Sequence, residues 1–146
     1  MDDDAIRQAD SRWIDSLPHR PPMRLLEVVV EVVPGERALA RRVAHPGDFY
    51  FDGHFPDCPV VPAIILIELV AQTGGIAAAA AEGGISTRQL RVAAIGPFRF
   101  PAAAGPGATM EATARVTGRF GQFCKIEGNV TADGVLVASG TLTLAG

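Results

Sequence analysis

Cysteine and lysine are both scarce in this sequence of 146 residues. Only Cys58 and Cys124 could pair, and two cysteines do not make the disulfide framework that stabilises small secreted domains. The N-terminus begins Met1-Asp2-Asp3-Asp4, so it lacks the basic start of a signal peptide. The sequence therefore predicts a protein of the reducing cytoplasm.

A strong charge of either sign is also missing. The formal net charge is −3 at pH 7, and Lys125 is the only lysine. No broad basic surface therefore favours binding to nucleic acid or to an anionic membrane. No internal repeat or low-complexity linker divides the chain. At this length we expect one domain with a substantial core, spanning residues 1–146.

One stretch is rich in apolar residues. It runs from Gly53 to Ala81 and reads GHFPDCPVVPAIILIELVAQTGGIAAAAA. From Pro62 onward it is apolar over a helical length, and only Glu68 and Gln72 have long polar side chains. A helix that is apolar on all sides is a buried helix. Because a buried carboxylate without partners is costly and takes up a proton, we expect Glu68 to be buried and protonated.

Two other interpretations of this helix exist. A membrane span requires roughly 20 apolar residues, and the stretch from Ile64 to Ala81 comes close. The polar residues and the glycine pair within it weaken that interpretation, and no cluster of Lys or Arg flanks it. Alternatively, Glu68 and Gln72, which share a helix face at i and i+4, form a polar stripe in contact with solvent. The histidine that precedes the helix favours a functional site instead.

That histidine, His54, lies fourteen positions before Glu68, and Pro56, Pro59 and Pro62 separate the two. Proline fixes φ and biases the residue before it toward extended conformations. The segment should therefore be stiff and hold His54 near the helix entrance, with Pro62 as the first helical residue. The free N–H groups of a helix N-terminus can polarise a carbonyl oxygen. An imidazole, a carboxyl and such donors favour acid–base chemistry beside a carbonyl.

These residues resemble the signature of the 3-hydroxyacyl-acyl-carrier-protein dehydratases of fatty acid synthesis, a hotdog-fold family. The segment GHFPDCPVVPAIILIELVAQ contains the family's His-Phe-Pro, the prolines that follow, and a helical Glu fourteen residues after the His. The resemblance extends to Leu17-Pro18-His19-Arg20 with Pro22, and to Ile95, Arg99, Phe100, Pro106 and Gly107 in one gapless register. It implies an α+β fold in which an antiparallel β-sheet wraps around a long central α-helix.

The resemblance also implies roles for individual residues. His54 is expected to remove or return the α-proton of the acyl chain, and Glu68 to protonate the departing β-hydroxyl. The backbone N–H of Ala63 is expected to contact the thioester carbonyl, with Gln72 as a further substrate-binding residue. Phe100 is expected to gate an apolar tunnel for the acyl chain. The implied substrate is a thioester of acyl carrier protein or coenzyme A, and no metal or other cofactor is required.

The expected assembly is a homodimer. Members of the family combine the His of one subunit and the Glu of the other in one site, and they often form trimers of dimers. A physical argument points the same way. A helix of about 20 residues spans on the order of 30 Å, and one curved sheet cannot cover every side of it. A second copy of the chain would cover the rest.

The sequence departs from the family at three places. Ala63 replaces the glycine at the carbonyl, Ala108 replaces an Asp, and Glu27-Val28 replaces an Asp-Arg pair. We predict reversible dehydration of 3-hydroxyacyl thioesters to trans-2-enoyl thioesters, a hydro-lyase activity. Two alternatives stay open. One is a hotdog acyl thioesterase, because the fold hosts both activities, and the other is a non-catalytic acyl-binding or partner subunit, because Ala63 adds a methyl group where backbone approaches ligand.

The other chemically capable residues are expected to be structural. Cys58 lies near His54 but has no base of its own. His19 lies in a proline-flanked loop and is expected to hydrogen-bond the backbone. A metal site would need His45, Asp48, Asp52 and His54, whose spacing matches no reliable zinc pattern.

Apolar periodicity and turn residues predict the remaining elements. An amphipathic helix is expected over residues 5–17, and strands over 25–33, 37–44, 90–95, 108–117, 122–132 and 135–144. Gly96-Pro97 predicts a bend or bulge after the third strand. Asp133-Gly134 predicts a two-residue hairpin turn between the last two strands.

Overall fold

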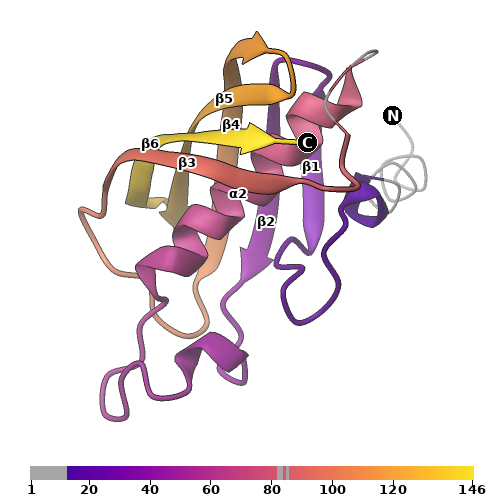
Figure 1. The fold of residues 1–146 in the computed structure, drawn as a ribbon. Coiled ribbons are helices and arrows are strands. Elements are labelled where there is room, and N and C mark those ends of the chain that lie inside the picture. Colours follow the sequence, from indigo (N-terminus) through magenta and orange to yellow (C-terminus); the bar gives the residue numbers. More distant parts are fainter. Residues whose placement is uncertain (1–12, 82–83, 85) are drawn as a thin grey trace.

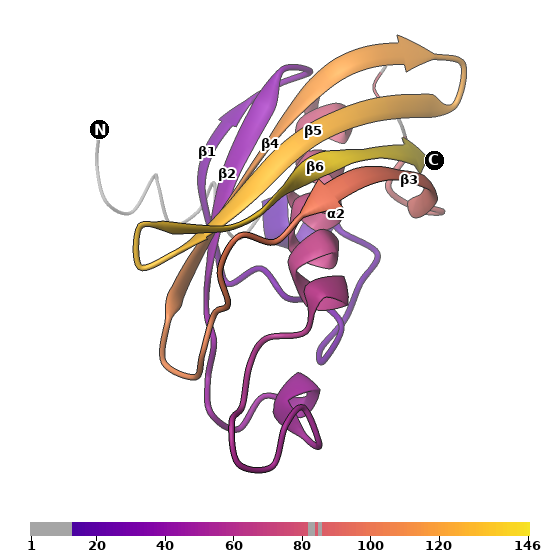
Figure 2. The same ribbon diagram turned by 90° about the vertical axis from the view of Figure 1, so that its left-hand side faces the viewer.

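A computed structural model describes residues 13–81, 84 and 86–146 of the chain. A long helix, α2 (Ala63–Ala80), packs against a curved sheet of six strands. Figures 1 and 2 show the strands curving around one side of this helix. The predicted α+β arrangement of an antiparallel sheet around one long helix is confirmed.

The strands are β1 (Val28–Val33), β2 (Arg37–Val43), β3 (Arg91–Arg99), β4 (Thr109–Phe120), β5 (Phe123–Ala132) and β6 (Val135–Ala145), and a short 3-10 helix, η1 (Phe49–Phe51), precedes α2. Their order in the sheet is β1-β2-β4-β5-β6-β3, and all neighbours are antiparallel. The two edges are therefore β1 and β3. All six predicted strands are confirmed. β3 continues through the predicted bend, where the register shifts between Ile95 and Phe98.

The structure describes only the end of the predicted N-terminal helix, and it places the start of α2 differently from the prediction. The helix expected over residues 5–17 lies mostly outside the described residues, although residues 13–16 are helical and Leu17 is buried in the core. At α2, the prediction that Pro62 is the first helical residue is wrong by one position. Pro62 has φ −60° and ψ 144°, which is extended backbone, so it is the N-cap and Ala63 starts the helix.

The second half of α2 is buried inside the protein. Every residue from Leu69 to Ala78 is buried, including the polar Gln72 and Thr73. By length and composition α2 could cross a membrane, with a mean hydropathy of 1.8, yet 67% of that window is already buried against the rest of the chain. The core helix of a soluble protein meets the same criteria, and most of α2 lies in the core of this fold.

Glycines allow α2 to approach the sheet closely. A Cβ added to Gly128 of β5 would lie 2.5 Å from Cγ1 of Val70 and 2.8 Å from the backbone oxygen of Thr113. A Cβ added to Gly74 would lie 2.9 Å from Cγ2 of Ile126. Carbon atoms pack at about 3.5–4.0 Å, so a side chain at either position would push the helix and the sheet apart.

We expect Gly128→Ala to lower the free energy of unfolding by about 1–3 kcal/mol, the usual cost of overpacking a core. The backbone oxygen of Thr113 is held in the sheet and cannot turn away as a flexible side chain can. Gly118→Ala on β4 is the matched control, because the nearest atoms to its Cβ, in Lys125, are 4.0 Å away. Denaturant unfolding measures both variants, and a Gly128→Ala protein as stable as wild type would contradict this description of the packing.

Candidate active site

His54 lies in the loop between η1 and α2 and is held there by hydrogen bonds on both sides. Its backbone N–H donates to the carbonyl oxygen of Phe51 at 3.0 Å, and its own carbonyl accepts from the N–H of Val60 at 3.0 Å. The ring atom Nδ1 lies 3.0 Å from the carbonyl oxygen of Val60. Because a carbonyl only accepts, Nδ1 carries the hydrogen, and the lone pair of the neutral ring is on Nε2. Nε2 is therefore the atom that can take a proton.

The N-terminus of α2 is open to a ligand. Pro62, the N-cap, makes no side-chain hydrogen bond to the first turn, and the first N–H groups of a helix have no acceptor inside it. Ala63 is exposed, and Ile64 exposes 73% of its surface. These features suit the predicted contact between the Ala63 N–H and a carbonyl oxygen, which stays a prediction.

Glu68 points from α2 toward the N-terminal segment. Its Oε1 accepts a hydrogen bond from Nε2 of Gln72 at 3.0 Å and lies 3.2 Å from Nε2 of His19. Its side chain is 23% exposed. The prediction of a buried carboxyl without partners is therefore wrong, because the group is partly open and has two partners. The prediction that the His19 ring bonds the backbone is also wrong, because it faces Glu68.

Gln72 is completely buried beneath Glu68. Its amide oxygen accepts from the N–H of Leu25 at 3.0 Å, and its amide nitrogen donates to the carbonyl oxygen of Met23 at 2.7 Å as well as to Glu68. Both polar atoms of the Gln72 side chain are therefore occupied by hydrogen bonds within the protein. Substrate binding by Gln72 stays a prediction, but these contacts favour a role in holding Glu68.

Glu68 and His19 open into a cavity of about 230 Å³. Its other walls are largely apolar and consist of Ala71, Leu90, Arg91, Val92 and Leu144. An apolar pocket with a few polar groups is the usual form of a small-molecule site. The cavity suits the predicted meeting of Glu68 with an acyl chain, which stays a prediction.

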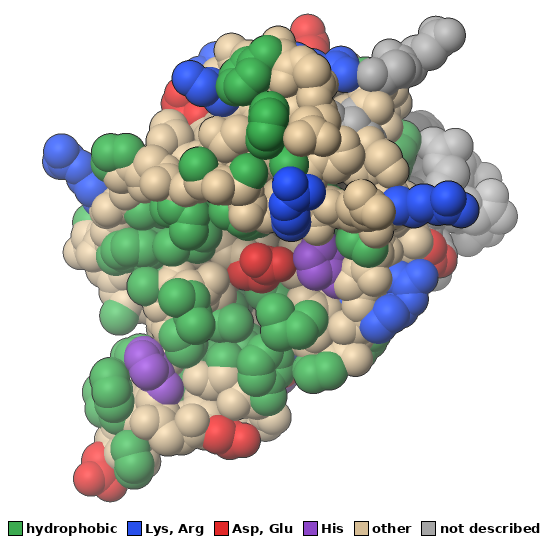
Figure 3. All heavy atoms as spheres, viewed as in Figure 1, with side chains coloured by type: hydrophobic (Ala, Val, Ile, Leu, Met, Phe, Trp, Pro, Cys, Tyr) green, Lys and Arg blue, Asp and Glu red, His purple; other side chains and the backbone are tan. Residues whose placement is uncertain are grey.

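His54 and Glu68 do not meet within one chain. Among the described residues, no hydrogen bond or ion pair joins their side chains. Around them, large apolar side chains are exposed on the loop, the helix and β3, including Phe55 at 54% and Ile95 at 57%. Figure 3 shows apolar side chains gathered over the face where the first turns of α2 emerge below β3. Phe100, just after β3, is 41% exposed and stacks on Phe98 with ring centroids 6.0 Å apart.

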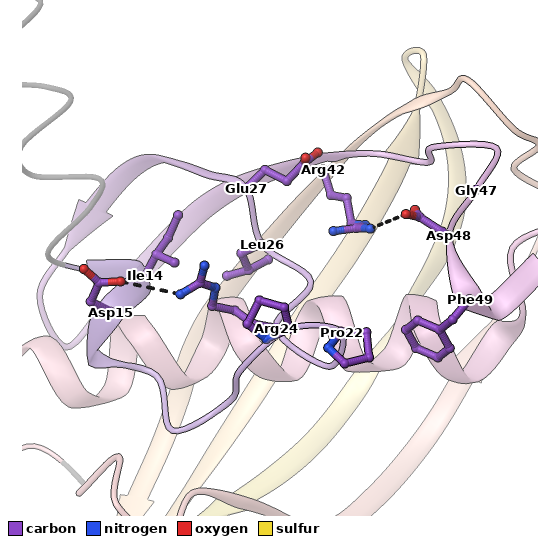
Figure 4. Close-up of a pocket in the computed structure, with 11 residues that line it drawn as sticks. Ile14, Asp15, Pro22, Arg24, Leu26, Glu27, Arg42, Gly47, Asp48 and Phe49 are labelled. Atoms are coloured by element: carbon purple, nitrogen blue, oxygen red, sulfur yellow. Dashed lines mark hydrogen bonds and ion pairs between the residues drawn. The ribbon is translucent and has the colours of Figure 1, made fainter.

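A second, larger cavity of about 830 Å³ contains neither His54 nor Glu68. Figure 4 shows Arg42 of β2 facing Asp48, the residue before η1. Nη2 of Arg42 lies 2.7 Å from Oδ1 of Asp48, and the hydroxyl of Tyr50 donates to Oδ2 of Asp48 at 2.6 Å. This network fixes η1, whose last residue accepts the backbone hydrogen bond of His54. The larger cavity therefore adjoins the anchor of the His54 loop.

The same network changes the acidity of its members. Partial burial works against ionisation of Asp48, but the hydrogen bonds from Tyr50 and Arg42 outweigh it and lower the pKa of Asp48. Burial and the hydrogen bond to Asp48 raise the pKa of Tyr50 to about 12. The anchor of the loop therefore keeps Asp48 ionised and Tyr50 protonated over the ordinary range of pH.

Tyr50 is the only tyrosine, so tyrosinate absorbance reports on it alone. We expect Tyr50 of the folded protein to ionise near pH 12, as its raised pKa requires. An exposed tyrosine ionises at about pH 10. The contribution of Tyr50 to stability is fully present below its pKa in the unfolded chain. It is lost as the pH rises through its pKa in the folded protein. Asp48→Ala should shift the transition downward. A wild-type transition at the exposed value, with the fold intact, would contradict the network.

Comparison with known proteins identifies the family. A family model described as a FabA-like domain matches residues 17–141. The chain is 33% identical over 129 residues to the 3-hydroxyacyl-[acyl-carrier-protein] dehydratase FabZ of Roseiflexus sp. (strain RS-1), covering 88% of this chain and 90% of that protein. It is 35% identical over 131 residues to FabZ of Streptococcus agalactiae serotype V, covering 90% of this chain and 92% of that protein.

Solved structures agree on the fold. The Dehydratase Heterocomplex ApeI:P from Xenorhabdus doucetiae superposes with a TM-score of 0.76 at 20% identity, covering 90% of this chain and 89% of the other. Zebra fish Thioesterase Superfamily Member 2 superposes with a TM-score of 0.70 at 15% identity, covering 97% and 98%. At identities this low the superpositions show the fold alone, and they confirm the predicted hotdog fold. The family model and the FabZ relatives show more, and the chain belongs to the FabA-like domain family.

Proposed function

We propose that this protein reversibly dehydrates 3-hydroxyacyl thioesters of acyl carrier protein to trans-2-enoyl thioesters, with His54 as the base and Glu68 as the acid. Two observations carry the proposal: a histidine in the loop before α2 whose Nε2 has no partner among the described residues, and a helical carboxyl that opens into an apolar cavity. The relatives named 3-hydroxyacyl-[acyl-carrier-protein] dehydratase support the same reaction and the same carrier. Coenzyme A thioesters share the reacting group and serve as the alternative substrate in assays.

The proposed reaction begins at the thioester carbonyl. Its oxygen accepts a hydrogen bond from the N–H of Ala63, where the positive end of the helix dipole favours developing negative charge. Nε2 of His54 takes the α-proton, and the electrons of that C–H bond form the new double bond. The bond from the β-carbon to oxygen breaks, and the oxygen takes the proton of Glu68 and leaves as water. Proton transfer from the imidazolium to the carboxylate restores both groups.

A second copy of the chain would complete this site. β3 is an edge strand of nine residues, and long edge strands with exposed apolar residues tend to pair with another chain. Pairing through β3 would cover Ile95 and bring the exposed face of α2 near its counterpart. We infer a homodimer in which His54 of one subunit faces Glu68 of the other, which accounts for their separation within one chain.

The thioesterase alternative has weaker support. The resemblance to Thioesterase Superfamily Member 2 rests on 15% sequence identity, which carries the fold but not the chemistry. The presence of both His54 and Glu68, together with the FabZ relatives, favours dehydration.

We also infer a cytoplasmic location, because the exposed Cys58 and the buried Cys124 are both free thiols.

The central test follows the loss of conjugated absorbance as a trans-2-enoyl thioester is hydrated. We expect wild type to be active, and His54→Ala and Glu68→Gln each to lose about 10²–10⁴ in kcat, the contribution typical of acid–base catalysis. Cys58→Ser, in the same loop as His54, is the control and should keep full activity. Thioester hydrolysis without enoyl exchange would overturn the proposal in favour of a thioesterase.

A second test removes the proposed carbonyl donor alone. Proline is tolerated at the first helical position, and Pro62 already has the extended backbone that a following proline requires. Ala63→Pro should therefore fold normally but lack the N–H, and kcat should fall by about 10²–10³. Ala63→Gly keeps the N–H and should remain active. Equal activity of the proline and glycine variants would rule out this donor.

A further inference from the structure

His19 contacts the proposed acid, yet the reaction described above assigns it no part. Its Nε2 lies 3.2 Å from Oε1 of Glu68, and Nε2 of Gln72 donates to that same oxygen at 3.0 Å. Within the part of the chain that the structure describes, Oε2 of Glu68 has no hydrogen-bond partner. The two oxygens of the carboxyl group are therefore in different surroundings.

The orientation of Gln72 follows from its buried neighbours. The N–H of Leu25 can only donate, so it must face the amide oxygen, and the carbonyl of Met23 can only accept, so it must face the amide nitrogen. The remaining hydrogen of that nitrogen then points at Glu68. Oε1 of Glu68 is consequently an acceptor in this bond.

The tautomer of His19 follows from the same reasoning. Its Nδ1 is buried and has no hydrogen-bond partner among the described residues. A hydrogen on Nδ1 would be a buried donor without an acceptor, and it would leave the lone pair of Nε2 facing Oε1 of Glu68, which is itself an acceptor toward Gln72. The hydrogen of the neutral ring therefore belongs on Nε2, which lies 3.2 Å from Oε1 of Glu68. Both neighbours of Oε1 are then donors.

We propose that His19 is a positioning residue that works with Gln72 to bind Oε1 of Glu68, so that Oε2 carries the proton delivered to the substrate. This inference rests on the proposed function, because it assumes that Glu68 is the acid. A proton on Oε1 would face two donor hydrogens, whereas a proton on Oε2 meets none. When Oε2 gives its proton to the departing hydroxyl, the two donors stabilise the negative charge left on the carboxylate.

Two variants at His19 test this role. His19→Leu replaces the donor with an apolar side chain of similar size. We expect kcat to fall about tenfold to a hundredfold, which is part of the contribution of acid catalysis. KM should change little, since the donor acts on the acid and not on substrate binding. His19→Gln replaces the ring with an amide whose N–H can reach Glu68, and it should recover most of kcat.

The matched control is His45→Leu. His45 also pairs with a glutamate, Glu27, at 2.8 Å, but both side chains are exposed and neither lines the Glu68 cavity. This variant should keep wild-type kcat. In a Glu68→Gln background, His19→Leu should add no further loss, because the two residues act as one unit.

The outcomes separate this inference from the proposed function. An inactive wild type would refute the function itself. An active wild type, a weak Glu68→Gln variant and a His19→Leu variant with full kcat would refute the role of His19 alone, as would equal losses in His19→Leu and His19→Gln. If His19→Leu does not fold, imidazole nitrogen NMR of wild type decides. The expected result is a hydrogen on Nε2 of His19, and a hydrogen on Nδ1 would overturn the proposal.

Discussion

Close packing of α2 against the curved sheet is the constraint on which the rest of this protein depends. The helix can approach β5 only because Gly128 presents no side chain to Val70. The second half of α2 is buried in that approach, whereas Ala63 and Ile64 at its N-terminus lie at the surface. The helix therefore has a buried end that stabilises the fold and an exposed end whose N–H groups are free to bind.

The polar residues near Glu68 connect that packing to chemistry. Gln72 lies on the face of α2 next to Glu68, one turn further into the core, and it joins the helix to the chain at Met23 and Leu25. A buried amide that satisfies two backbone groups costs little, whereas the same amide without partners would be strongly destabilising. The same contacts fix the direction of its remaining hydrogen. Stability of the core and orientation of the proposed acid thus depend on one side chain.

Much of this could be predicted from the sequence, and the reasons are local. The spacing of apolar residues predicted α2 and all six strands, and Asp133-Gly134 predicted the turn between β5 and β6, where Asp133 does adopt a positive φ of 49°. Pro62 was misplaced by one position because proline suits both the N-cap and the first helical residue. The resemblance to the dehydratases, carried by His54, Glu68 and their spacing, led to the family that the comparisons identify.

The partners of Glu68 could not be predicted, because they lie far away in the chain. Gln72 bonds to Leu25 across 47 positions and to Met23 across 49, and His19 reaches Glu68 from the same distant segment. No local pattern encodes such a contact, and a histidine beside prolines is typical of an ordinary loop. The network of Arg42, Asp48 and Tyr50 was missed although its members are close in the chain, because only the folded turn between β2 and η1 brings their side chains together.

The central claim is that each active site combines residues of two subunits, and a mixed dimer tests it most directly. His54→Ala and Glu68→Gln chains with different tags can be co-expressed and the mixed dimer purified through both tags. If each site is shared between subunits, one of the two sites of the mixed dimer contains both intact residues. The mixed dimer should then have about half of the wild-type activity. If each site lies within one chain, both sites of the mixed dimer are damaged. Activity no higher than that of the two parent variants would contradict the account.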